Sequence, residues 1–172
     1  MSQRGALHYA VTYRYRVTGA QRGQLNGLRI TRVLHPAGAA DAIATMGLAV
    51  FEKPVVLYAA RVFDIELQII TDHPIDRVQI SDPLPAGMEA VDTSFKTSNA
   101  ETPAASWQID DQQIYHDRIE AYADHLGPGI YTLHYIARTV TPGTFSWPGA
   151  EARLIGQPEE FGRTASASLR VQ

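Results

Sequence analysis

Six histidines are the residues of this sequence best suited to hold a metal ion or to transfer protons near neutral pH. They are His8, His35, His73, His116, His125 and His134. No two of them lie at a spacing found in known zinc motifs, although His116 and His134 could face each other from neighbouring strands. We therefore expect hydrogen-bonded or exposed histidines, with no metal ion and no cofactor.

Acidic residues offer two further chemical interpretations. Asp110-Asp111 could suggest calcium, but the alternating acids around a glycine that a calcium loop needs are absent, so the pair predicts a hairpin turn. A second group could form an acid–base site: Asp117, Glu120, Asp124 and His125. On a strand Asp117 would face the side opposite Glu120, which separates the group and favours a solvated face.

The residue types that are missing exclude several classes of function. The sequence has no cysteine, so this chain alone can form no disulfide, thiolate nucleophile or thioester. It also contains no nucleophile elbow, phosphate-binding loop, dinucleotide fingerprint or zinc-protease motif. Lys and Arg number 15 against 18 Asp and Glu, a net charge of −3, which argues against a nucleic-acid partner. We expect no enzymatic activity.

Aromatic residues gather near both ends of the chain: Tyr9, Tyr13 and Tyr15 at the start, and Tyr131, Tyr135, Phe145 and Trp147 towards the end. They could stack against bases or sugars, or they could pack across strands inside a core. Since no basic residues surround them, we favour packing.

Alternation with a period of two residues predicts the elements that carry these side chains. Apolar or aromatic residues occupy the odd positions of residues 7–17, 65–69, 131–137 and 165–171, as expected for half-buried strands. Residues 55–60 are apolar throughout, which is typical of a strand covered on both faces.

Glycine and proline interrupt the strands at short intervals. Asn26-Gly27 predicts a hairpin, and two prolines should end a strand at Ile80, with Gly87 turning the chain back. Residues 37–46 are rich in alanine and could form a short helix, a single turn or a loop, whereas residues 92–104 are expected to be a loop. Eight to ten strands without repeats predict an all-β fold, an antiparallel β-sandwich of the macroglobulin-like or immunoglobulin-like kind.

The length of 172 residues is that of one domain, which we assign to residues 1–172. Residues 1–24 belong either to this domain or to a preceding one. No apolar run resembles a signal peptide or is long enough to span a bilayer, so the chain is either cytosolic or a piece of a longer exported protein. A sandwich of this size buries its inward faces alone, so we expect a monomer.

Several short motifs resemble a known family in their order and spacing. They are Gly27-Leu-Arg-Ile-Thr-Arg32, Asp82-Pro-Leu-Pro-Ala-Gly-Met-Glu89, His116-Asp-Arg118, Gly129-Ile-Tyr-Thr-Leu-His-Tyr-Ile-Ala-Arg138, Thr141-Pro-Gly-Thr-Phe145 and Phe161-Gly-Arg-Thr164. The succession resembles the carboxy-terminal macroglobulin-like domain (MG10 type) of bacterial α2-macroglobulins over residues 25–172.

This resemblance implies a noncatalytic scaffold domain of a broad-spectrum protease trap in the periplasm or cell envelope. The parent protein would bind target proteases, and many members couple to them through a Cys–Gln thioester. The implied partners of this domain are other domains of the same polypeptide, above all the thioester domain, which it would help to keep from water. The alternative is an independent adhesion or ligand-binding β-sandwich.

One stretch departs from the family. Members commonly carry an Ala-Glu-x-Met-Tyr-like sequence where this chain has Ala152-Arg-Leu-Ile-Gly156. Ile155 could replace the methionine, but Gly156 offers no ring, so the parent either protects its thioester differently or lacks one. We expect residues 151–160 to form an exposed loop whose interdomain contact involves Arg153, Leu154, Ile155 and Gly156. The alternative is a strand that buries both Leu154 and Ile155.

Overall fold

The computed structural model describes residues 9–13, 19–92 and 105–172, and in this part of the chain all regular secondary structure is β-strand. Fourteen strands are described: β1 (Gln24–Asn26), β2 (Arg29–Pro36), β3 (Ala44–Met46), β4 (Val55–Leu57), β5 (Val62–Thr71), β6 (Ile75–Pro83), β7 (Met88–Val91), β8 (Asp111–Ile114), β9 (Arg118–Leu126), β10 (Gly129–Thr139), β11 (Gly143–Trp147), β12 (Glu151–Leu154), β13 (Phe161–Arg163) and β14 (Ala167–Val171). None of the described residues forms a helix that could cross a membrane.

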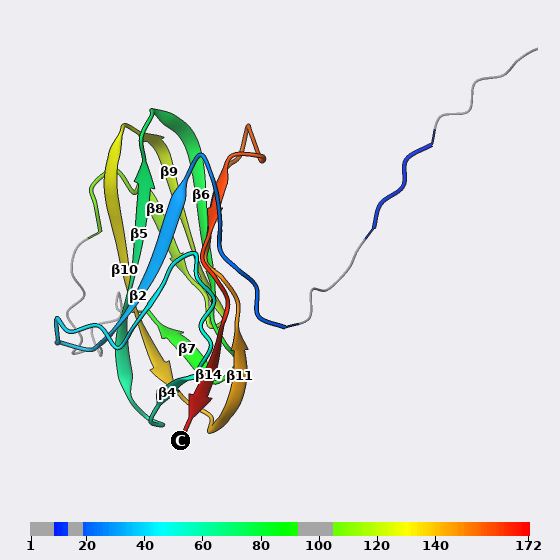
Figure 1. The fold of residues 1–172 in the computed structure, drawn as a ribbon. Helices are drawn as coiled ribbons and strands as arrows, with labels where there is room; N and C mark the ends of the chain where they lie inside the picture. Colours follow the sequence, from blue (N-terminus) through cyan, green and yellow to red (C-terminus); the bar gives the residue numbers. More distant parts are fainter. Residues whose placement is uncertain (1–8, 14–18, 93–104) are drawn as a thin grey trace, which may run out of the picture.

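Two large antiparallel sheets face each other (Figure 1). One has the strand order β1-β13-β12-β6-β9-β8 and the other β3-β2-β5-β10-β7. A third, three-stranded sheet, β11-β14-β4, lies at one end of the sandwich and includes a parallel pair between β14 and β4 (Figure 1). The predicted all-β sandwich is confirmed, with a small third sheet that the alternation pattern had not indicated.

The alternating positions of the long strands build the core. In β5 the buried apolar residues are Phe63, Ile65, Leu67 and Ile69, and β10 buries every second residue from Tyr131 to Ala137. These side chains pack against Val78 and Ile80 of β6 in one cluster of buried residues. Period-two strands of this length bury one face each, which is why two sheets are needed to close the core. The predicted half-buried strand at 7–17 is wrong for residues 9–13, which form no strand and are exposed, and the rest of it lies outside the described residues. The predicted loop at 92–104 also lies outside them, except for Asp92.

Three predictions made from local sequence need correction. Residues 37–46 contain no helix: a turn follows Pro36, and the chain continues into β3, because Val33 and Leu34 of β2 pair with Thr45 and Ala44. Asn26-Gly27 is a turn, with φ of +85° at Gly27, but β1 and β2 enter opposite sheets and so form no hairpin. The run at 55–60 is a three-residue edge strand that leaves Val56 exposed.

Two further predictions about turns and strand ends also need correction. Asp111 begins β8 and pairs with Tyr122, and the turn lies just before it, closed by the hydrogen bond from Ile109 N to Ser106 O. β6 continues beyond Ile80 to Pro83, since its neighbours still pair there. Gly87 has no positive φ; instead the ring of Phe145 occupies the space that a Cβ would fill.

A buried polar cluster joins the three sheets. Arg32 on β2 and Asp82 on β6 are both fully buried, and they form an ion pair that crosses the sandwich. Tyr135 on β10 donates its hydroxyl to Asp82 Oδ2 at 2.7 Å, and Arg32 donates to the carbonyl of Pro148 at 2.9 Å. The Arg32 guanidinium also lies 4.9 Å from the ring centre of Trp147 on β11. Burial, followed by the nearby Asp82 charge, raises the pKa of Tyr135 well above its usual value, so the hydroxyl remains a donor.

Asp82→Asn tests how much the fold depends on this cluster. The substitution keeps the shape of the side chain but leaves the Arg32 charge buried without an anion, which costs about 3–5 kcal/mol of unfolding free energy. Tyr135→Phe removes one hydrogen bond to the carboxylate and should cost less, about 1.5–3 kcal/mol. Urea unfolding of the 172-residue chain measures both. An Asp82→Asn chain as stable as wild type would contradict a structural role for the ion pair.

Candidate functional site

The segment predicted to make an interdomain contact forms a hairpin of β12, a turn and β13, which we call the β12–β13 hairpin (residues 151–163). The predicted loop at 151–160 is corrected in part, because residues 151–154 pair with β6 as strand β12. The exposed turn begins at Ile155, whose amide donates to the carbonyl of Arg77 at 2.9 Å. A further hydrogen bond, from Glu160 N to Gln157 O at 2.9 Å, closes the turn.

The four predicted contact residues do not share one environment. Leu154 is only 6% exposed and packs in the core, whereas Ile155 is 52% exposed. Arg153 lies on the outer face of the six-stranded sheet and donates to Gln79 Oε1 at 3.1 Å. Gly156 lies against the Arg77 guanidinium, where a Cβ would come within 2.6 Å of Nη2. The hairpin therefore presents Arg153, Ile155 and Gly156 at the surface, and Leu154 anchors it.

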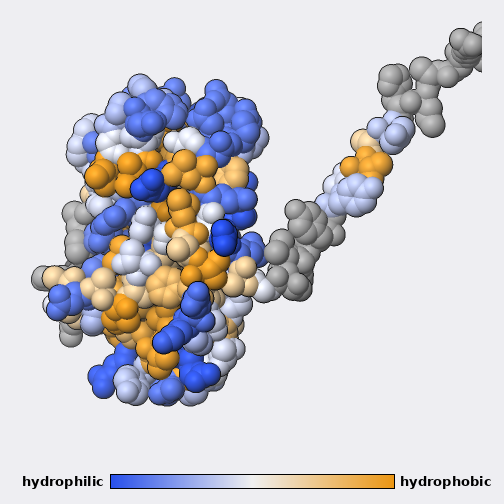
Figure 2. Space-filling model, in the orientation of Figure 1, coloured by the Kyte–Doolittle hydropathy of each residue, from blue (hydrophilic) through white to orange (hydrophobic). Residues whose placement is uncertain are grey.

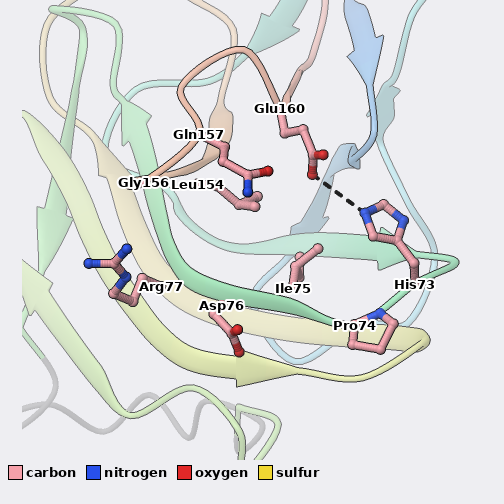
Figure 3. Close-up of a pocket in the computed structure, with 9 residues that line it drawn as sticks. All are labelled: His73, Pro74, Ile75, Asp76, Arg77, Leu154, Gly156, Gln157 and Glu160. Atoms are coloured by element: carbon pink, nitrogen blue, oxygen red, sulfur yellow. Dashed lines mark hydrogen bonds and ion pairs between the residues drawn. The ribbon is translucent and has the colours of Figure 1, made fainter.

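A cavity of about 230 Å³ lies under the hairpin turn (Figure 3). Its lining residues come from the β5–β6 connection, the start of β6 and the hairpin: His73, Pro74, Ile75, Asp76, Arg77, Leu154, Gly156, Gln157 and Glu160. In the close-up, His73 and Glu160 point towards each other across the cavity, whereas Arg77 extends to the opposite side (Figure 3). The cavity is thus closed at one end by the β5–β6 connection.

His73 is the titratable group of this cavity whose electrostatics are most altered. It contacts Asp72 at 2.7 Å through Nδ1 and Glu160 at 3.4 Å through Nε2. The hydrogen bond to Asp72, followed by that to Glu160, raises the pKa of His73 above its usual 6.5. A protonated His73 therefore links the β5–β6 connection to the β12–β13 hairpin.

A second hollow, of about 370 Å³, lies on the outer face of the six-stranded sheet between Ile155 and the β8–β9 strands. Arg118 lies 4.2 Å from the ring centre of Tyr115 and pairs with Asp117 at 3.1 Å and with Glu120 at 3.0 Å. Arg118 therefore links the carboxylate of Asp117, just before β9, to that of Glu120 within β9. Each carboxylate is paired with this arginine, an arrangement that suits a solvated ion-pair network better than an acid–base pair.

Three further histidines are held by hydrogen bonds to carboxylate or carbonyl oxygens. His35 contacts the carbonyl of Ala40 at 3.0 Å, His125 contacts Asp76 at 2.6 Å, and His134 contacts Asp64 at 3.3 Å. His116 precedes β9 in the six-stranded sheet whereas His134 lies in the five-stranded sheet, so the two are not on neighbouring strands. His8 lies outside the described residues. No group of three possible metal ligands occurs among those that are described.

The aromatic residues divide between core and surface. Tyr131, Tyr135 and Trp147 are buried, as the packing interpretation predicts, whereas Tyr9 and Tyr13 are exposed. Tyr15 lies outside the described residues. Figure 2 shows that apolar atoms on the face viewed there are interrupted by charged ones, so they do not form one continuous platform.

Comparisons with known proteins agree with the resemblance seen in the motifs. The family model described as the bacterial alpha-2-macroglobulin MG10 domain matches residues 27–159. An alpha-2-macroglobulin homolog from Nostoc sp. is 53% identical over 173 residues, which cover 99% of this chain and 9% of that protein.

Solved structures show the same fold at lower identity. A Salmonella alpha-2-macroglobulin reacted with methylamine superposes with a TM-score of 0.69 at 23% identity, covering 90% of this chain and 10% of that one. The native conformation of Escherichia coli alpha-2-macroglobulin gives a TM-score of 0.68 at 22% identity, covering 93% of this chain and 10% of that one.

The present chain thus spans only about a tenth of the length of these relatives. The family match extends over most of the sandwich, from Gly27 into the β12–β13 hairpin, and the Nostoc protein is similar along the whole chain. This chain belongs to the bacterial alpha-2-macroglobulin family, as an MG10 domain.

Proposed function

We propose that this chain acts as a noncatalytic scaffold domain within a longer protease-trap polypeptide of the periplasm or cell envelope. It packs against the domain that carries a reactive thioester and helps to keep water from that bond. Its family consists of inhibitors rather than enzymes, and its relatives are about ten times longer. The family match also argues against an independent adhesion module.

The observation that carries this proposal is the exposure of Ile155 on a rigid hairpin. The preceding Leu154 is anchored in the core, and the Ile155 amide is bonded to β6, so the turn has little freedom to fold its apolar side chain inward. An exposed isoleucine side chain is not stabilised by water, whereas its burial against a partner removes apolar surface from water and is favourable in free energy. Ile155 is therefore suited to enter an apolar recess of a neighbouring domain.

The chemistry of a thioester explains why such a contact would matter. A thioester is hydrolysed by water and attacked by small amines, so it persists only at a covered, dry site. This chain has no cysteine and must leave the thioester to another part of the polypeptide. One similar structure is that of a Salmonella protein reacted with methylamine, a small amine of the kind that opens thioesters. The contribution of this domain is then steric, through the aliphatic side chain of Ile155 next to Gly156.

Ile155→Ser in the full-length polypeptide tests the contact. We expect faster spontaneous appearance of free thiol, because a hydroxyl at the tip covers an apolar recess less well. In the isolated 172-residue chain the unfolding free energy should change by no more than about ±0.5 kcal/mol, as for other surface substitutions, so its melting temperature should stay close to that of wild type. Free-thiol titration and thermal unfolding measure the two effects.

Ile130→Ser is the matched control, since Ile130 is also exposed but lies on β10 of the other large sheet. It should change neither the thiol release nor the melting temperature. If Ile155→Ser instead destabilises the isolated chain by about 2 kcal/mol or more, Ile155 belongs to the core of this domain and the contact is disproved.

His73→Gln tests how the hairpin is held. Because the folded-state pKa of His73 is raised, its charge stabilises the fold below the unfolded pKa of about 6.5, and this contribution disappears as the pH rises through the folded pKa. The melting temperature of the wild type should exceed that of His73→Gln most at about pH 5.5, with the gap closing by about pH 8.5. His116→Gln, whose ring has no carboxylate partner among the described residues, should show no such gap. A gap for His73→Gln that widens with pH would contradict the link.

A further inference from the structure

Arg77 adopts a backbone conformation that is rare for its residue type. Its φ is +54°, in the left-handed region that glycine and asparagine favour, although it lies inside the long strand β6. The ladder with β9 pairs Asp76 with His125 and Val78 with Ala123 but does not pair Arg77 itself. A non-glycine residue in this region of the backbone is strained.

Part of this conformation has a structural explanation. The carbonyl of Arg77 accepts the hydrogen bond from Ile155 N at 2.9 Å, which fixes the first residue of the hairpin turn. Glycine would accept the same bond at lower cost, since only the backbone is involved. The hydrogen bond therefore accounts for the turn of the backbone, but not for a long cationic side chain at this position.

The guanidinium of Arg77 has no anionic partner among the described residues. On the same outer face, Arg118 pairs with Asp117 and Glu120, and Arg153 lies 3.9 Å from Glu151. A Cβ on Gly156 would lie 2.6 Å from Arg77 Nη2, so the absence of a side chain there leaves room for the guanidinium, whose charge also acts on Tyr122. An exposed cation is thus held beside Ile155, directed away from the His73–Glu160 contact (Figure 3).

We propose that Arg77 and Ile155 form a two-point docking site for a carboxylate-bearing segment of another domain of the same polypeptide. The apolar side chain enters a recess, and the guanidinium beside it forms a bidentate pair with an Asp or Glu carboxylate. The charge of Arg77 selects an anion. Because the carbonyl of Arg77 accepts the hydrogen bond from Ile155 N, the two residues lie close enough for one partner segment to contact both side chains. This inference rests on the proposed interdomain role of the hairpin.

The occupant follows from charge and from the length of the relatives. This chain covers 9% of the Nostoc protein, so most of such a polypeptide lies outside the residues described and can supply the carboxylate. An apolar contact alone would fix the depth at which Ile155 enters, but not the orientation of the partner. A bidentate ion pair adds that orientation, because its two hydrogen bonds require coplanar groups.

Arg77→Gly separates docking from folding, because the two effects have opposite signs. Glycine relieves the unfavourable φ, so the melting temperature of the isolated 172-residue chain should rise by a few degrees. In the full-length polypeptide the same substitution should raise the spontaneous release of free thiol about 5- to 10-fold, as expected for loss of one partly desolvated ion pair. A fall in the melting temperature of the isolated chain would overturn the proposal, since the guanidinium would then stabilise its own domain.

Conservative variants and salt identify the partner's chemistry. Arg77→Lys should keep part of the protection against thiol release, whereas Arg77→Gln should release thiol as fast as Arg77→Gly. The difference between wild type and Arg77→Gln should shrink from 50 mM to 500 mM NaCl because salt screens the pair. Arg170→Gln, an exposed arginine of β14 without a described anionic partner, is the control and should behave as wild type.

The two proposals fail in different ways. If Ile155→Ser accelerates thiol release in the full-length polypeptide but Arg77→Gln does not, the docking role of Arg77 is disproved and the hairpin contact stands. If neither does, the proposed interdomain function fails as well. Binding of inorganic phosphate at millimolar concentration to the isolated chain, lost in Arg77→Gln, together with unchanged thiol release by the full-length Arg77→Gln polypeptide, would show a site for free anions only and would also overturn the proposal.

Discussion

The ion pair between Arg32 and Asp82 is the interaction on which the arrangement of this domain depends. It connects β2 of one large sheet to β6 of the other, and both side chains are fully buried. Two charges in a core are tolerated only when each has good partners, which here include Tyr135, Pro148 and the Trp147 ring. The requirement that all these groups meet at one point restricts how the three sheets can pack.

The position of the β12–β13 hairpin depends on this ion pair. β6 carries Asp82 near one end and Arg77 near the other, and β12 pairs with the residues between them. Once β6 is held against the opposite sheet, the register of β12 places Leu154 inward and Ile155 at the turn. A core interaction of the neighbouring strand thus helps to determine which side chains the hairpin presents at the surface.

Stability and function compete at Arg77. An arginine in the left-handed region weakens its own domain, and its side chain gains no ion pair within the described part of that domain. Strain of this kind is retained where the surrounding structure over-determines a conformation, and here β6 and the hairpin turn do so from two sides. The cavity next to it is bordered by a different contact, between His73 and Glu160, and hydrogen bonds to Asp72 and then to Glu160 raise the pKa of His73.

The sequence by itself determined the fold class and the family, because period-two alternation and short motifs are local patterns that need no partner to be recognised. It left two alternatives for Leu154 and Ile155, one of them with an apolar side chain outside the core, and the structure selects that one. A search for catalytic motifs missed a signal for the buried ion pair. Two charged residues occupy the alternating positions of a strand that point into the core: Arg32 lies between Ile30 and Leu34, and Asp82 follows Ile80 by two residues. Only the tertiary structure decided that Arg32 and Asp82 meet and that β1 and β2 enter different sheets. It also decided that Arg77 lies beside Gly156. The physical reason is that all three arrangements depend on the packing of strands that are distant in sequence.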